Sequence, residues 1–369
     1  MTASKSSFVQ AFAPGWFAAV MGTGVISISM ASWQAVVPFA SVLQMVFLFL
    51  TLFFFVVVFF PWLLRWILYP QSAWRDLNHP VSAAFFPTMP ISLVVIGIAL
   101  EKTGHRLLPE TFLWGVLQAL WLLGATGILL FALLILNIFF HKPEIEWQTS
   151  TLGWLIPPVS ALIVPLLGAS LSLHFYGTTW GELNWLGSLI FLGIGGFLFI
   201  FVMAVVMTRY IFYALPPAHL APTMWVGLAP TSILAILSLR LVKPAVQFFQ
   251  ATPEMEQWLM FLARPAGIVL WGFALFWLLL ALMVTLEVWR KSNLPFALSW
   301  WAFIFPLGAF ATAGGVLYQS VSSVLFLGVG LAALILVIVL WTVVTFRTVR
   351  GVLDGTLFGL HAGQKEKTA

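Results

Sequence analysis

The chain has 369 residues, of which 62% are hydrophobic and only 7% carry a charged side chain. Soluble globular domains carry about 25% charged residues, so this composition excludes a water-soluble protein and indicates an integral membrane protein. The formal net charge is +5, and cysteine is absent, which excludes disulfides, thiol nucleophiles and zinc–thiolate sites.

Ten apolar segments are each long enough to cross a bilayer, which takes about 20 residues of helix. In chain order they cover residues 14–33, 38–67, 82–100, 111–140, 152–171, 183–213, 221–240, 256–288, 298–317 and 322–348. The odd-numbered segments are close to the minimum length, whereas the even-numbered ones are longer and more uniformly apolar. We therefore predict an all-α membrane domain over residues 14–348, between a short N-terminal segment, 1–13, and a C-terminal tail, 349–369.

Lys and Arg residues are distributed unequally between the two ends of these predicted helices. Eleven lie on the side of both chain termini, and five lie on the other side, namely Lys102, Arg106, Arg240, Lys243 and Arg264. The positive-inside rule then predicts that both termini are cytoplasmic in a multi-pass protein of the cell membrane. Arg264 falls inside a predicted helix, where it either extends to the outer interface or pairs with an anion or a neighbouring acid.

A proline recurs at a comparable place in each odd-numbered segment. The five are Pro14, Pro87, Pro158, Pro230 and Pro306, with successive spacings of 73, 71, 72 and 76 residues. A period of this length equals one pair of helices, so we interpret the chain as a helical hairpin repeated five times. Proline within a span deletes a backbone hydrogen bond and is predicted to kink each of these helices.

Kinked helices are tolerated in a membrane where their freed backbone groups face other protein or a water-filled cavity. The five odd-numbered helices are therefore predicted to surround a common interior, with the even-numbered helices between them and the lipid. Small and polar residues concentrate in the odd-numbered helices, where they either line a pore or form close contacts between helices. The candidates for lining the pore are Gly22, Thr23, Ser27, Thr88, Ser160, Thr231, Ser232 and Thr312.

The predicted inner helices contain no Asp, Glu, Lys or Arg before residue 240. Cation pathways usually contain carboxylates within the membrane, so this absence argues against a cation or metal transporter. A passage lined by hydroxyls and glycine amides, in a protein of positive net charge, can admit weakly hydrated anions. We expect small anions as substrates.

Two strings resemble the tellurite-resistance/dicarboxylate transporter family, which includes the fungal malic acid permease, the yeast sulfite pump and plant slow anion channels. The first is PGWFAAVMGTG at residues 14–24, and the second is SWWAFIFP at residues 299–306. The resemblance extends over residues 10–350. It implies a pore formed by the five odd-numbered helices, with helix pairs in quasi-five-fold arrangement, and a homotrimer with one pore in each subunit.

The resemblance also implies that a phenylalanine in the ninth helix occludes the pore, and by motif position this residue is Phe305. Phe86 stands at the equivalent place before Pro87 in the second repeat, which predicts that it narrows the same constriction. The alternative for either residue is ordinary core packing.

The nature of the transport stays open between a gated channel and a carrier. A proton-coupled dicarboxylate (malate) carrier needs a titratable group in its pathway, and the candidates are His174, Glu182, Glu101 and His105, all near helix ends where solvated loop residues are common. Because the family that the chain resembles includes the yeast sulfite pump, a sulfite exporter is another alternative. Because no catalytic motif is present, we expect no enzyme activity, metal, cofactor or nucleic-acid partner.

Overall fold

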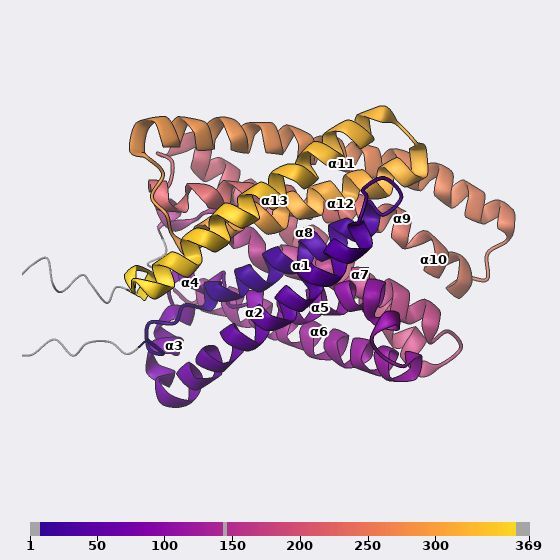
Figure 1. The fold of residues 1–369 in the computed structure, drawn as a ribbon, viewed down its shortest axis with the longest axis horizontal. Coiled ribbons are helices and arrows are strands. Elements are labelled where there is room, and N and C mark those ends of the chain that lie inside the picture. The colour runs from indigo at the N-terminus through magenta and orange to yellow at the C-terminus, as the bar shows by residue number, and fades with distance from the viewer. Residues whose placement is uncertain (1–7, 143–145, 359–369) are drawn as a thin grey trace, which may run out of the picture.

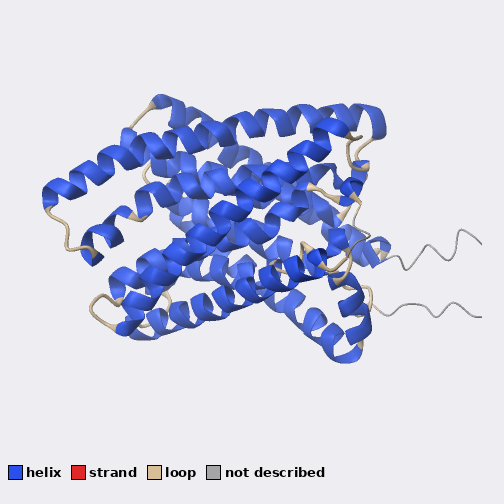
Figure 2. Cartoon of the chain, turned by 180° about the vertical axis from the view of Figure 1, so that it is seen from behind, coloured by secondary structure: helices blue, strands red, loops and turns tan. Residues whose placement is uncertain are grey.

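The computed structural model describes residues 8–142 and 146–358. Within these residues every regular element is a helix, and the connections between helices are short (Figure 2). All ten predicted spans are confirmed as helices long and apolar enough to cross a membrane.

Five of these helices form one set that starts each hairpin. They are α1 (Phe17–Ser32), α5 (Thr88–Thr103), α7 (Ile156–His174), α9 (Leu228–Arg240) and α12 (Ile304–Val321). Each packs on the long helix that follows it, and these partners are α2 (Ala40–Leu68), α6 (Glu110–Phe140), α8 (Thr179–Phe212), α11 (Pro253–Ser292) and α13 (Val324–Leu353). The short helices α3 (Pro70–Leu77), α4 (Pro80–Ala83) and α10 (Val242–Phe248) lie in connections.

Burial separates the two sets, as the sequence predicted. At least 72% of the most apolar stretch of each odd-numbered span is buried, against at most 33% for each even-numbered span. The exposed side chains of the second set are large and apolar, such as Phe53 in α2 and Phe197 in α8. Because apolar side chains need no water, this exposed layer suits lipid, and the first set forms the interior.

The five inner helices contact one another in a closed order. Helix α1 packs against α5 and α12, α7 packs against α5 and α9, and α9 packs against α12. Figure 1 shows the long ribbons running alongside one another across the view, with α11 along the upper edge. Since each inner helix has an inner neighbour on both sides and an outer helix behind it, one face of each is left for the middle of the molecule.

The repeated prolines lie at the beginnings of the inner helices, which corrects the prediction that they kink helix interiors. Pro158, Pro230 and Pro306 each lie in the first turn of an α-helix, Pro87 precedes α5, and Pro14 begins a 3₁₀ turn before α1. The first-turn N–H groups have no partner within a helix, so proline deletes no hydrogen bond there. The 3₁₀ segments that precede four of the inner helices are Pro14–Trp16, Leu152–Leu155, Ala218–Gly227 and Leu298–Phe303.

The described ends of the chain lie together. The rings of Phe8 and Phe358 are 4.4 Å apart, centroid to centroid, and Trp16 stacks on Phe358 at 5.5 Å. Both ends therefore lie at the end of the molecule where the inner helices begin.

Candidate functional site: a cavity among the inner helices

A small cavity lies where the five inner helices begin, and every one of them contributes to its wall. Its volume is about 40 Å³. The lining includes two residues three positions apart from each span, namely Ala18 and Met21, Phe85 and Thr88, Ile156 and Val159, Val226 and Ala229, and Ala302 and Phe305. Positions i and i+3 share one face of a helix, so the five repeats present equivalent faces to one point.

The cavity wall is almost entirely apolar and carries no charged side chain. Three lining residues lie in the first turns of their helices, namely Thr88 of α5, Ile156 of α7 and Phe305 of α12. The first-turn N–H groups of Thr88, Ile156 and Ile304 donate to the carbonyl oxygens of Phe85, Gly153 and Trp301 in the preceding turns. The positive end of each helix dipole lies at this end of the helix. The five inner helices thus begin around one cavity whose wall has no ionised group.

Phe305 lines this cavity and is 8% exposed. It lies between Trp301 and Pro306, which belong to the same wall. The space beside it has room for about one water molecule, whose share of liquid volume is about 30 Å³. The cavity is therefore too small for an ion with its full hydration shell.

Phe86 does not lie in this wall, and the prediction that it narrows the constriction is wrong by one residue. Its ring packs 6.0 Å from that of Trp66 and 5.8 Å from that of Phe131, on outer helices, whereas Phe85 lines the cavity. The error came from aligning the repeats on their prolines. Pro306 stands one position after the lining residue Phe305, whereas Pro87 stands one position before the lining residue Thr88, so this alignment pairs Phe305 with Phe86. Thr88 is thus the counterpart of Phe305.

Three of the predicted pore-lining residues have clear partners. Thr88 lines the cavity and donates a hydrogen bond to the carbonyl oxygen of Pro14 at 3.1 Å. Thr23 accepts one from Trp341 Nε1 of α13 at 2.9 Å, and Ser27 donates one to the carbonyl oxygen of Gln44 of α2 at 2.8 Å. Thr23 and Ser27 therefore join α1 to outer helices, which corrects their assignment to the pore.

Two further candidates join α1 to α12. A Cβ atom on Gly22 would lie 3.1 Å from Trp301 and 3.2 Å from Ile304, and Thr312 Oγ1 lies 2.7 Å from Ser29 Oγ. Ser160 donates within its own helix, to the carbonyl oxygen of Ile156 at 2.6 Å. These contacts favour the second role considered for the small and polar residues, which is packing within and between helices rather than lining a pore.

The hydroxyls of Thr231 and Ser232 are buried in α9 and have no hydrogen-bond partner within the described residues. They follow Ala229, which lines the cavity. Buried hydroxyls normally find a partner in protein or water, so these two are exceptions on an inner helix.

Comparison with known proteins agrees with this architecture. The SLAC1 family model, described as voltage-dependent anion channel, matches residues 11–349. The chain belongs to the SLAC1 family. An uncharacterized transporter of Methanocaldococcus jannaschii is 33% identical over 97% of this chain and 98% of its own length.

Two fungal relatives of this SLAC1-family protein have names that state a substrate. A sulfite efflux pump of Arthroderma otae is 25% identical over 92% of this chain and 90% of its own length. A malic acid transport protein of Schizosaccharomyces pombe is 20% identical over 94% of this chain and 80% of its own length. The predicted resemblance is confirmed, and the protein is an anion-transporting membrane protein of a transporter and channel family, not an enzyme.

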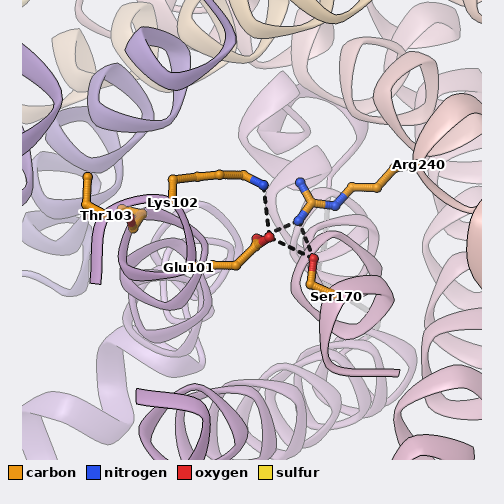
Figure 3. Close-up of polar contacts among 6 residues, drawn as sticks. Glu101, Lys102, Thr103, Ser170 and Arg240 are labelled. Atoms are coloured by element: carbon orange, nitrogen blue, oxygen red, sulfur yellow. Dashed lines mark hydrogen bonds and ion pairs between the residues drawn. The ribbon is translucent and has the colours of Figure 1, made fainter. Parts of the chain in front are cut away.

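The SLAC1-family chain also contains a charged network that the sequence analysis missed. Helix α5 extends past its predicted end at residue 100 to Thr103, so Glu101 lies in the helix and is not a loop residue. Glu101 accepts hydrogen bonds from Lys102 Nζ at 2.8 Å, Ser170 Oγ at 2.8 Å and Arg240 Nη2 at 2.5 Å (Figure 3). The sequence contains one signal for this network: Glu101 follows the end of the predicted helix 82–100, and Arg240 ends the predicted helix 221–240.

The remaining titratable candidates lie at the surface. His105 and Glu182 are exposed, and the exposed ring of His174 stacks on Trp114 with 4.0 Å between centroids. Arg264 is exposed too and donates from Nε to Ser320 Oγ at 3.2 Å. None of these four residues belongs to the cavity wall.

Proposed function

We propose that the five inner helices enclose a channel-like passage for small anions, closed in this conformation at Phe305. The observation that carries the proposal is the cavity to which all five inner helices contribute paired residues, with Phe305 in its wall. Pores in membrane proteins are gated by apolar constrictions that exclude water, and an aromatic ring in a narrow apolar wall forms such a constriction. Movement of the ring away from the axis would open a hydrated route.

The charge distribution supports anions over cations. The cavity wall contains no carboxylate, and the inner helices begin around it with the positive ends of their dipoles. The unpartnered hydroxyls of Thr231 and Ser232, beyond Ala229 in α9, are further donors for an ion or for water. Sulfite and malate are the substrates named for two relatives, and both are small anions.

The test is anion flux into proteoliposomes for the wild type and for Phe305→Ala. We expect the variant to conduct at least about tenfold faster, which corresponds to lowering the barrier by about 1.4 kcal/mol. Phe86→Ala is the matched control, because it removes the same atoms from a ring that packs on the outer helices. Equal flux in the wild type and Phe305→Ala, with both proteins folded, would remove Phe305 from the gate.

A proton-coupled malate carrier or a sulfite exporter is the second candidate. The specific observation in its favour is Glu101, a carboxylate inside a membrane-spanning helix, because such groups serve proton-coupled transport. A pH-jump assay separates the two mechanisms. Malate uptake by a symporter brings protons into the vesicle, whereas a channel conducts malate without acidifying the lumen.

Assembly and orientation are proposed on separate grounds. We infer a homotrimer from the family resemblance, to be tested by the mass of the detergent-solubilised complex. Cytoplasmic termini follow from the excess of Lys and Arg at the end of the molecule where Phe8 meets Phe358. Labelling of single cysteines introduced near each terminus would report the side on which they lie.

A further inference from the structure

The network around Glu101 contains more positive than negative charge. Two cations, Lys102 and Arg240, surround one carboxylate, and Ser170 donates to that carboxylate and accepts from Arg240 Nη2 at 2.7 Å. A structural ion pair would need one cation. The second leaves the cluster with a net charge of +1, counting the groups in their usual ionised forms.

Two members of the network, Ser170 and Arg240, lie beyond the cavity on the same faces of α7 and α9 as its lining residues. Ser170 follows the cavity residue Val159 by 11 positions, and Arg240 follows Ala229 by 11 positions. Eleven residues make about three helical turns and about 16 Å, so each pair shares one face. Arg240 in α9 bonds to Glu101 in α5 and to Ser170 in α7, so the network joins three inner helices (Figure 3).

Water and small ions can reach the cations of this network. The side chain of Arg240 is 21% exposed and that of Lys102 is 34% exposed, whereas Glu101 is 10% exposed. Arg240 donates both of its bonds to the network from Nη2, so Nε and Nη1 have no partner within the described residues. The guanidinium fork matches the paired oxygens of a carboxylate or oxyanion, and part of that fork is available here.

We propose that Arg240, Lys102 and Ser170 form a binding subsite for a small carboxylate or oxyanion, at the end of the passage opposite Phe305. The inference rests on the proposed anion passage. Glu101 is the internal competitor of this subsite, because its carboxylate occupies Nη2 of Arg240 and weakens the hold of two cations on a bound anion. Conduction requires that the anion bind weakly enough to be released, and competition from the Glu101 carboxylate limits the affinity in this way.

Proteoliposome flux of malate and of sulfite, measured against concentration, tests the subsite. Arg240→Gln is expected to raise KM about tenfold for both anions, since it removes a charge-assisted contact. Arg240→Lys keeps the charge but removes the fork, so KM rises less. Glu101→Gln is expected to lower both KM and the maximal rate, because a bound anion is then released more slowly.

Arg264→Gln is the matched control, since Arg264 is an exposed cation of outer helix α11 that contacts Ser320 at the end of α12. Its KM should equal that of the wild type. If KM is unchanged in Arg240→Gln and Glu101→Gln while Phe305→Ala still raises flux, the subsite is wrong and the passage stands. A structural role in the helix ends alone would give this result.

A binding measurement distinguishes failure of the subsite from failure of the passage. Malate or sulfite, added at constant ionic strength, should raise the Tm of the detergent-solubilised wild type and of Arg264→Gln, but not that of Arg240→Gln. Equal shifts in all three proteins would overturn the subsite. A shift that depends on Arg240, in a protein that transports no anion, would support the subsite as a binding site and overturn the passage.

Discussion

Thr88 Oγ1 lies 3.1 Å from the carbonyl oxygen of Pro14, so one hydroxyl joins the beginnings of the first two inner spans at the cavity wall. The same hydroxyl also lies 2.5 Å from the carbonyl oxygen of Phe85. Both acceptors belong to segments that precede regular α-helix, and the carbonyl oxygen of Phe85 also accepts from the N–H of Thr88 at 3.1 Å. Thr88 therefore helps to fix the position of the aromatic residue Phe85 in the cavity wall.

Thr88→Val should destabilise the protein by about 1 kcal/mol, because it keeps the side-chain shape but removes a buried donor. Thr208→Val is the control, since Thr208 is exposed on α8 and donates only within its own helix, to the carbonyl oxygen of Ala204. Reversible unfolding in mixed micelles measures both. Equal free energies of unfolding for the two variants would contradict this role of Thr88.

Gly168 lets α7 approach α8 closely. A Cβ atom there would lie 2.1 Å from Ser188 Oγ, 2.8 Å from Trp121 Nε1 and 3.3 Å from the carbonyl oxygen of Asn184. Gly168→Ala should cost about 1–3 kcal/mol, because the serine and the tryptophan must both move.

Gly193→Ala is the opposite case in the same hairpin, since a Cβ atom at Gly193 meets nothing within 4 Å. Replacing a glycine within a helix by alanine stabilises the helix by about 0.5–1 kcal/mol, so the free energy of unfolding of this variant should exceed that of the wild type. The two substitutions add the same methyl group, and a common shift in unfolding free energy would show that the α7–α8 approach is not tight.

Hydropathy and length were sufficient to predict the ten spans and the division into inner and outer helices. Both properties are local, and a bilayer makes them decisive. Hydropathy did not reveal which face of an inner helix points to the middle, because these helices are buried on all sides and have no apolar stripe. Thr23 and Ser27 were therefore assigned to the pore, although their partners are Trp341 and Gln44 on outer helices.

The register of the repeat was the second part that the sequence could not determine. Proline spacing is nearly constant, but the 3₁₀ segments before the helices differ in length, from Pro14–Trp16 to Ala218–Gly227. Adjacent residues of a helix point about 100° apart, so an error of one position exchanges Phe85 for Phe86. The Glu101 network escapes sequence analysis for another reason, since Ser170 and Arg240 are 69 and 139 residues from Glu101 and only the assembled ring joins them.

Gln118 of α6 and Asn184 of α8 form a reciprocal amide pair inside the membrane-spanning region. The two hydrogen bonds measure 2.7 and 3.2 Å, and both side chains are buried. Gln118→Leu or Asn184→Leu should each cost about 1–2 kcal/mol, because one amide is left without its partner. The double variant should lose less than the sum of the single variants, and a coupling energy of zero in the cycle would contradict the pair.

Phe85 provides the sharpest test of the corrected cavity wall. It belongs to the segment before α5, and Phe305 belongs to α12; these helices are not neighbours in the inner ring, so the two rings enter the cavity from separate sides. Phe85→Ala should raise anion flux in proteoliposomes, by less than Phe305→Ala, because the ring of Phe305 remains. The double variant should conduct faster than either single variant.

Phe86→Ala separates this prediction from a general loosening of the segment. Phe86 is the next residue in the chain and is more deeply buried than Phe85, so its truncation disturbs packing at least as much. Its flux should stay at the wild-type level even where its Tm falls. If Phe86→Ala conducts and Phe85→Ala does not, the aromatic wall opposite Phe305 is formed by the residue that the proline spacing first indicated, and the cavity described above is not the route.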